Sequence, residues 1–281
     1  MRVALSGASG LVGRFLLGGL RAGGHEVVAL GRREVPGAEW RSWRLGEAAP
    51  LAGCDALVHA AFSHAPGRYR GGEGDDPAGF LRLNRDGSLR LFEEARAAGL
   101  SRAVFLSSRA VYGDYPTGME LAEDLAPRPD TLYGEMKWAV EQGLAALAGS
   151  GFATASLRAT GVYGPGPDHK WRELFEAFAA GEEIAPRVAT ELHGDDLAAA
   201  AALLLEAPEA VLAARSFNAS DITLDRRDLL ERVARITGQG GALPDRADAA
   251  HVSAMRCDRL AAIGWRPRGI EGLDAALRAM L

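Results

Sequence analysis

The glycine-rich stretch at residues 7–13 restricts the fold of this chain more than any other part of the sequence. An apolar run at residues 2–6 predicts a strand before it, and the apolar spacing at residues 15–20 predicts a helix after it. In this context glycines let the backbone approach a dinucleotide, and the helix N-terminus receives its pyrophosphate. The alternative is a turn that only lets helix and strand pack. We predict the dinucleotide site, with contacts from Gly7, Ser9, Gly10, Leu11, Val12 and Gly13.

The next predicted strand, residues 25–30, determines which cofactor is expected. An acidic residue at its end would bind the adenosine ribose hydroxyls, whereas an arginine pairs with a 2′-phosphate. The strand end has no acidic residue and is followed by Arg32 and Arg33. We therefore expect these arginines to bind NADP(H) in preference to NAD(H), the alternative being solvated loop arginines. Leu45, in a short strand predicted at residues 43–45, is expected to pack on the adenine.

A further buried strand is predicted at residues 54–61. Its last residues, Ala60 and Ala61, are small enough for their backbone to run against the cofactor. His59 ends the apolar run, so we expect a packed, hydrogen-bonded histidine rather than a ligand or a base. Residues 63–77 show no periodicity and are expected to form a mobile loop over the site.

Two serines follow the fifth predicted strand, residues 103–106. The carboxyl ends of parallel strands form the edge of the sheet where ligands bind. We therefore expect Ser107 beside the cofactor and Ser108 beside a substrate carbonyl or hydroxyl.

Tyr133 and Lys137 are four residues apart, so on a helix they share one face. The lysine charge favours the phenolate, and lowering a tyrosine pKa from about 10 to about 7 requires roughly 4 kcal/mol. Tyr133 would then be a general acid/base near neutral pH. The alternative is an exposed helix with a lysine whose stem covers its surface.

Several motifs in the same order resemble the extended short-chain dehydrogenase/reductase family, specifically its NAD(P)-dependent epimerase/dehydratase group. They are residues 7–13, Asp55 with residues 59–61, residues 84–87, residues 107–113, Pro129 before Tyr133 and Lys137, residues 157–165, and residues 193–196. The resemblance implies that Tyr133 is the catalytic acid/base and that Lys137 lowers its pKa and binds the nicotinamide ribose. It implies that Ser108 polarises the substrate oxygen and that Asn84 holds the local backbone and the cofactor. We also expect cofactor contacts from Thr160 and Val162.

The substrate side is expected to involve Ser108, Arg109, Tyr112 and Gly161. We expect Tyr112 to be a packed aromatic near the substrate rather than a proton donor. Dehydratases of the group carry an acidic pair where this chain has Arg109 and Ala110, so dehydration is not expected. Sugar-nucleotide enzymes of the group have an asparagine where this chain has Gly161, which argues against a nucleotide-sugar substrate.

These residues predict an NAD(P)-dependent oxidoreductase that moves a hydride to or from a sugar-like or other small alcohol or ketone. An NAD(P)-dependent epimerase of sugars or nucleotide sugars uses the same groups and is the first alternative. A binding protein that senses NAD(P) without catalysis is the second, although such a protein has no need of Ser108, Tyr133 and Lys137 together.

The expected fold class is α/β, a Rossmann-type doubly wound parallel sheet with a small, mostly helical C-terminal cap that binds the substrate. The expected division is residues 1–160 with about 191–220 for the NAD(P)-binding domain, and about 161–190 with 221–281 for the cap. Asp195 and Asp196 are expected to cap the helix that they begin.

The charge pattern bears on partners and location. The net charge is −5 and both signs are interspersed, so neither nucleic acid nor a membrane surface is an expected partner. Cys54 and Cys257 are isolated in sequence, which predicts a reducing cytoplasm and neither a disulfide framework nor a metal site. We also expect a homodimer through the helices at residues 84–99 and 133–147.

Overall fold

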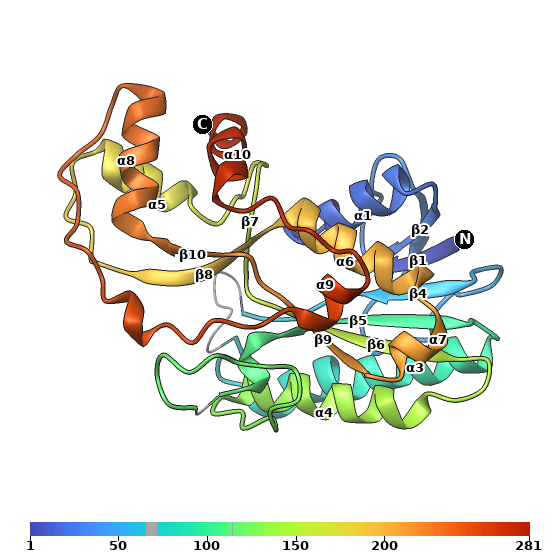
Figure 1. Cartoon of the computed structure of the whole chain (residues 1–281). Helices are drawn as coiled ribbons and strands as arrows, with labels where there is room; N and C mark the ends of the chain where they lie inside the picture. The colour runs from blue at the N-terminus through green and yellow to red at the C-terminus, as the bar shows by residue number, and fades with distance from the viewer. Residues whose placement is uncertain (66–71, 114) are drawn as a thin grey trace.

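The computed structural model describes residues 1–65, 72–113 and 115–281. A seven-stranded parallel sheet lies at its centre, in the order β3-β2-β1-β4-β5-β6-β9 (Figure 1). The strands are β1 (Arg2–Ser6), β2 (Glu26–Gly31), β3 (Glu39–Ser42), β4 (Ala56–His59), β5 (Arg102–Ser108), β6 (Ala153–Ala159) and β9 (Ser216–Ala219). The strand order reverses direction on either side of β1, as in a doubly wound sheet, so the predicted fold class is confirmed.

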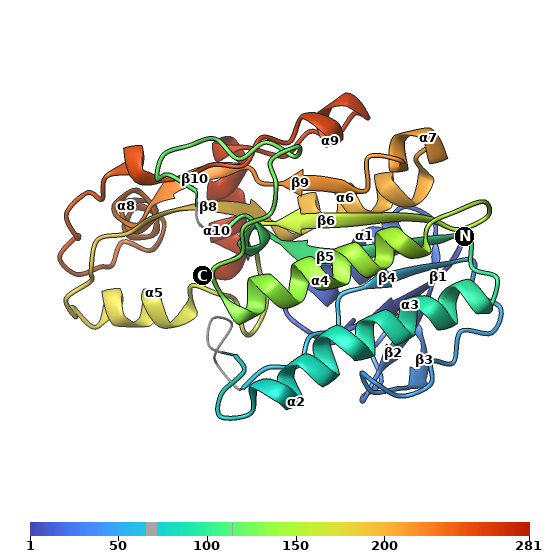
Figure 2. The ribbon, with the colours of Figure 1, turned by 90° about the horizontal axis from the view of Figure 1, so that it is seen from below.

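Helices cover both faces of this sheet because its strands are apolar on both sides. Helices α1 (Gly13–Ala22) and α6 (Gly194–Glu206) lie on one face, and α3 (Gly87–Ala97) and α4 (Leu132–Leu147) lie side by side on the other (Figures 1 and 2). The shorter elements are α2 (Pro77–Leu81), a π-helical turn (Arg82–Asp86), a 3-10 turn (Arg109–Val111), α7 (Glu209–Leu212) and α9 (Asp258–Ala262). Leu260 and Trp265, from and after α9, are buried in the core under α1 and α6.

The cap contains a second sheet of three strands in the order β10-β8-β7. Its strands are β7 (Gly161–Tyr163), β8 (Val188–His193) and β10 (Ile222–Asp225). Helices α5 (Arg172–Ala179), α8 (Arg226–Thr237) and α10 (Leu273–Met280) share an apolar core with it (Figure 1). The cap is thus less purely helical than the sequence indicated. Its strands are three to six residues long and contain Thr190 and Glu191, so they lack a clear apolar alternation.

Three local predictions differ from the structure. The third strand is Glu39–Ser42, not residues 43–45, because the chain turns after it to bury the Trp43 side chain. The helix predicted at residues 84–99 begins within the π-helical turn Arg82–Asp86 and is regular only from Gly87 onward. Residues 66–71 of the loop predicted over the site lie outside the described residues.

The start of α6 also corrects a prediction, because His193 rather than an aspartate caps it. Its Nδ1 accepts a hydrogen bond from the Asp195 backbone N–H at 3.1 Å. The Asp196 carboxylate instead accepts from the Arg268 backbone N–H at 3.2 Å and from its Nε at 3.0 Å. The acidic first turn therefore ties the C-terminal segment to the main domain. In the described ranges no helix is both long and apolar enough to cross a bilayer.

Candidate active site

The glycine turn after β1 forms a cradle in which side chains do not fit. Gly7 has φ +78°, and a Cβ there would lie 2.7 Å from the Ala61 backbone nitrogen. At Gly13 a Cβ would lie 1.9 Å from the Gly7 carbonyl oxygen. At this point the backbone of the glycine turn is in direct contact with the backbone at the start of α1 and at the end of β4, with no side chain between them. Ser9 and Gly10 are exposed at the rim, so this cradle has the form that a cofactor pyrophosphate requires at a helix N-terminus.

A buried hydrogen-bond network fixes the end of β4 to this cradle. The Ser6 hydroxyl oxygen accepts from the backbone N–H groups of Ala60 and Ala61, both at 3.2 Å. The same oxygen lies 2.6 Å from Nδ1 of His59. The two alanines predicted to line the cofactor are thus held beside Gly7 through their backbones.

The other side of the His59 ring determines its tautomer. Its Nε2 lies 2.8 Å from the Ser88 hydroxyl, which donates its proton to the Asn84 carbonyl. Ser88 therefore accepts from Nε2–H, and Nδ1 accepts from Ser6. Burial, and secondarily the Lys137 charge, lower the pKa of His59 to about 3, so the ring is neutral at pH 7. His59 is a packed, hydrogen-bonded residue, as the sequence predicted.

Asn84 lies inside the π-helical turn and holds the chain that follows β4. Its Oδ1 accepts from the Ser63 backbone N–H at 2.7 Å, and its Nδ2 donates to the Ser63 carbonyl at 2.7 Å. Nδ2 also donates to the Phe80 carbonyl at 3.0 Å. Wide turns of this kind are frequent at functional sites. Here the turn directs one amide side chain to two backbone groups of a neighbouring segment.

The start of α4 packs tightly against the turn after β5. Thr131 caps the helix by accepting from the Gly134 backbone N–H at 3.1 Å. A Cβ on Gly134 would lie 2.4 Å from the Ala110 carbonyl oxygen, so only glycine permits this approach. Tyr133, next to this glycine, is thereby placed at the carboxyl end of β5 with Ser108.

Lys137 lies one helical turn after Tyr133. Its Nζ donates to the Leu106 carbonyl at 2.7 Å and is 5.8 Å from the centre of the Tyr133 ring. Burial lowers the pKa of Lys137 to about 7, while the Glu141 carboxylate opposes this shift. The Tyr133 ring also meets Phe62 edge to face, with ring centres 5.3 Å apart. The predicted phenol and ammonium groups therefore occupy one face of α4 over the end of the sheet.

The remaining predicted contacts lie around this edge. Ser108 is half-buried. Its hydroxyl oxygen accepts a hydrogen bond from the Ala110 backbone N–H at 3.1 Å. The Arg109 guanidinium donates to the Ser253 carbonyl at 3.1 and 2.9 Å, which connects the site to the C-terminal segment. The Thr160 hydroxyl donates to the Thr190 carbonyl at 2.9 Å.

The contacts predicted near the adenosine end lie beyond the cradle. Arg32 and Arg33 are exposed at the end of β2, and Leu45 is half-buried against the core under α3 and α4. Val162, predicted as a further cofactor contact, is also half-buried. Over the residues that the structure describes, no group of three or more His, Cys, Asp or Glu side chains could hold a metal ion.

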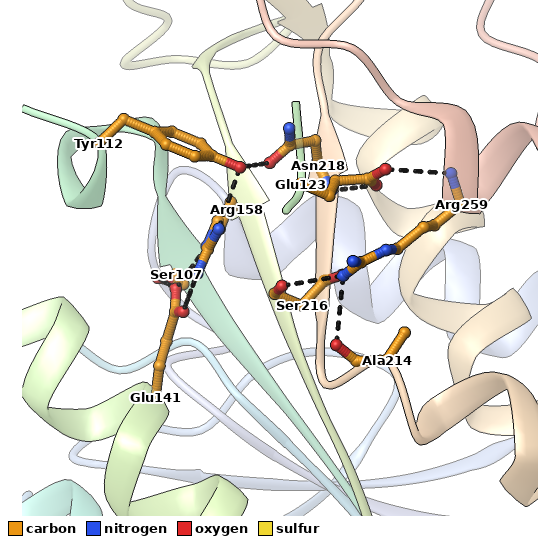
Figure 3. Close-up of polar contacts among 9 residues, drawn as sticks. All are labelled: Ser107, Tyr112, Glu123, Glu141, Arg158, Ala214, Ser216, Asn218 and Arg259. Carbon is orange, nitrogen blue, oxygen red and sulfur yellow. Dashed lines mark hydrogen bonds and ion pairs between the residues drawn. The ribbon is translucent and has the colours of Figure 1, made fainter. Parts of the chain in front are cut away.

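Ser107 and Tyr112 belong to a buried polar network behind this edge (Figure 3). Ser107 donates to Glu141, which forms a 2.7 Å ion pair with Arg158. Nη1 of Arg158 donates to the Tyr112 hydroxyl at 3.0 Å, and that hydroxyl donates to Oδ1 of Asn218 at 2.8 Å. Their hydroxyl groups are therefore engaged within the protein, and Tyr112 is 1% exposed. The sequence analysis did not predict this network. Arg158, a charged residue within the otherwise uncharged buried strand β6, was the one local indication of it.

The sequence matches the model of the NAD-dependent epimerase/dehydratase family over residues 3–220. The chain belongs to this family. A 3-diazoavenalumate denitrifying reductase from Streptomyces is 32% identical over 223 residues, which are 73% of this chain and 72% of that protein. A UDP-glucose 4-epimerase from Corynebacterium glutamicum is 27% identical over 179 residues, 58% of this chain and about half, 53%, of that protein's length.

A solved structure of MoeE5 in complex with UDP-glucuronic acid and NAD gives a TM-score of 0.81. It is 26% identical and the superposition covers 100% of this chain and 97% of that one. The two sequence relatives are a reductase and an epimerase, so this family member is an enzyme. Its Rossmann-type fold and its family agree with the predictions from sequence.

Proposed function

We propose that this enzyme is an NAD(P)-dependent oxidoreductase that transfers a hydride to or from a sugar-like or other small alcohol or ketone. The observation that carries this proposal is the buried Lys137 side chain beside Tyr133 at the edge of the sheet that also bears the glycine cradle. The bound nicotinamide would supply or accept the hydride. The residues of the cradle would hold the pyrophosphate, and Lys137 would hold the adjoining ribose.

In this proposal Tyr133 passes the proton of the substrate oxygen. A charged Lys137 favours the phenolate, so the phenol can act near neutral pH. The Ser108 hydroxyl donates to the substrate oxygen as its charge develops. His59 takes no part in proton transfer, because its ring is neutral and both of its nitrogens are engaged inside the protein.

The test replaces Tyr133 by phenylalanine. We expect turnover to fall by about a hundredfold to ten-thousandfold, as is typical when a general acid/base is removed, with cofactor affinity nearly unchanged. A panel of sugars, sugar nucleotides and simple ketones is followed by cofactor absorbance, and affinity by fluorescence titration. Tyr115→Phe is the matched control, because that hydroxyl donates to the Ala126 carbonyl. Unchanged turnover in Tyr133→Phe would exclude the assigned role.

The same panel distinguishes the alternatives when the products are also analysed for a change of configuration. An epimerase, favoured by the similarity to a UDP-glucose 4-epimerase, returns the cofactor to its starting state, so the substrate changes configuration with no net absorbance change. A sensing protein binds the cofactor and converts none of the panel.

We also propose a preference for NADP(H), supported by the exposure of Arg32 and Arg33 at the end of β2. Arg32→Ala is expected to weaken NADP(H) binding about tenfold, because it removes a charge-assisted contact to the 2′-phosphate, and to leave NAD(H) binding unchanged. Fluorescence titration with both cofactors measures this, with the exposed Arg278→Ala as control. Tighter binding of NAD(H) by the unaltered enzyme would contradict the preference.

A further inference from the structure

A cavity of about 460 Å³ lies beside α4, on the face of the central sheet that α3 and α4 cover. It is bounded by α4, by β6 and the start of β9, and by the segment 123–127 that precedes α4. Small-molecule sites in proteins usually have volumes of about 300–1,000 Å³. Ser108, Tyr133 and Lys137 are not among its lining residues, so it is separate from the candidate active site.

The walls of this cavity suit an aromatic ring. Trp138, Gln142 and Ala145 line it and share one face of α4, because they are four and three residues apart. The segment before the helix contributes the apolar side chains of residues 125–127. A flat ring can stack on the Trp138 indole and displace water from these apolar walls.

Two hydrogen-bond donors in the lining have no acceptor in the part of the chain that the structure describes. Ser156 lines the cavity from β6, whereas its neighbours Ala155 and Leu157 belong to the core on the opposite face of the sheet. Ser156 is 4% exposed, and its hydroxyl has no hydrogen-bond partner among the described residues. The same holds for the Trp138 indole N–H. Both groups are therefore available to an acceptor on a ligand.

Arg215 brings a cation to the same cavity in a strained backbone conformation. Its φ is +64°, and within the described ranges it is the one non-glycine residue with a positive φ. Glycine and asparagine adopt this left-handed region more readily than arginine does. Strain of this kind is concentrated at functional sites. Among the described residues no carboxylate lies within ion-pair distance of the Arg215 guanidinium, so no protein partner balances its charge.

The other charged residues of the lining are paired, hydrogen-bonded or screened. Arg158 and Glu141 form a buried ion pair with each other (Figure 3). Glu123 accepts hydrogen bonds from two backbone N–H groups. Asp124 is exposed, so water and salt screen its charge. The unpaired charge of the lining is thus that of Arg215, and its missing partner is an anion.

We propose that this cavity binds a small molecule that joins an aromatic ring to a carboxylate, and that this ligand is neither the substrate nor the cofactor. The ring packs on Trp138 and on the apolar residues 125–127. The carboxylate accepts hydrogen bonds from Arg215 and Ser156. Because Trp138 follows Lys137 directly, the ligand contacts the helix that also carries the candidate catalytic groups.

The test compares phenylacetate with 2-phenylacetamide, which has the same ring without the charge, and with acetate, which has the charge without the ring. Calorimetric titration measures their affinities for the enzyme with and without saturating cofactor. We expect phenylacetate to bind with a dissociation constant of about 1 mM or lower, and the other two probes to bind about tenfold or more weakly. Saturation with cofactor should leave the affinity for phenylacetate unchanged, because the two sites are separate.

One variant removes the cation. Arg215→Asn is expected to abolish the preference for phenylacetate over 2-phenylacetamide. Asparagine tolerates a positive φ, so the melting temperature should be unchanged or higher. The same exchange at an exposed position outside the lining, Arg278→Asn, is the control and should leave the preference unchanged.

A second variant fills the cavity. Ala145→Leu is expected to weaken phenylacetate binding by about tenfold or more, because the larger side chain occupies part of the space. Ala146→Leu adds the same side chain at the next position of α4, which is exposed and does not line the cavity, and is its control.

Melting temperatures of all variants separate loss of binding from loss of folding. No binding of phenylacetate, equal affinity for phenylacetate and either of the other probes, or loss of phenylacetate binding in the presence of cofactor would overturn the proposal. A preference that survives in Arg215→Asn, or binding that survives in Ala145→Leu, would overturn it too. None of these outcomes depends on turnover, so the proposed function is tested separately by Tyr133→Phe.

Discussion

Gly13→Ala is expected to reduce cofactor affinity by about a hundredfold or more and to destabilise the protein by about 3 kcal/mol or more. The new Cβ would lie 1.9 Å from the Gly7 carbonyl oxygen and 2.8 Å from the Ala8 Cα. Both are backbone atoms, so no side-chain rotation can relieve the overlap. The glycine turn or the start of α1 must shift, and either change opens the cradle. Fluorescence titration with NAD(P)H and thermal unfolding measure the two effects.

Gly18→Ala provides the control in the same helix. Gly18 is exposed in α1 and a Cβ there meets nothing within 4 Å. Replacing it should stabilise the helix by about 0.5–1 kcal/mol, because alanine loses less backbone entropy on folding. The two substitutions add the same methyl group five positions apart and are expected to have opposite effects on stability. Unchanged cofactor affinity in Gly13→Ala would show that the cradle does not hold the cofactor.

Glu141→Gln is expected to destabilise the protein by about 3–5 kcal/mol, the usual cost of leaving a buried charge without its partner. Glu141 and Arg158 have side chains that are 4% and 3% exposed, and Nε and Nη2 of Arg158 both donate to the carboxylate. The amide of glutamine removes the charge and one acceptor. Denaturant unfolding, with the midpoint and slope analysed together, measures the loss.

An exposed pair of the same type is the control. Arg172 and Glu176 are 53% and 67% exposed and four residues apart on α5, so Glu176→Gln should cost about 0.3–0.5 kcal/mol. The double variant Glu141→Met with Arg158→Met should be more stable than Glu141→Gln, because no buried charge remains unpaired. A small effect of Glu141→Gln, similar to that of Glu176→Gln, would contradict the role given to the buried pair.

The central fold could be predicted because its signals are local. Apolar runs followed by glycines or serines mark each strand of the main sheet and its carboxyl end, and the Tyr133–Lys137 spacing marks one helix face. The glycines at positions 7 and 13 could be assigned to a close backbone approach for the same reason. The structure then adds which backbone atoms approach each of them.

The features that were missed depend on partners far apart in the chain. Arg158 and Glu141 are 17 residues apart, and Arg158 and Tyr112 are 46 apart, so no local pattern connects them. The cap sheet combines β7, β8 and β10 from separate stretches with little apolar periodicity. The helix start at His193 was misassigned because an imidazole nitrogen took the capping position that an aspartate usually occupies.

The network around His59 has a mechanical consequence. Each hydroxyl and ring nitrogen in it has one direction of donation, from the backbone beside Gly7 through Ser6, His59 and Ser88 to the turn that contains Asn84. The Asn84 side chain in turn accepts a hydrogen bond from the Ser63 backbone N–H and donates one to the Ser63 carbonyl. The glycine cradle and Ser63 are thus connected by an unbroken chain of hydrogen bonds, so their positions are mechanically coupled. A displacement of either one would be transmitted to the other through a connection that has no exposed polar atoms to rearrange.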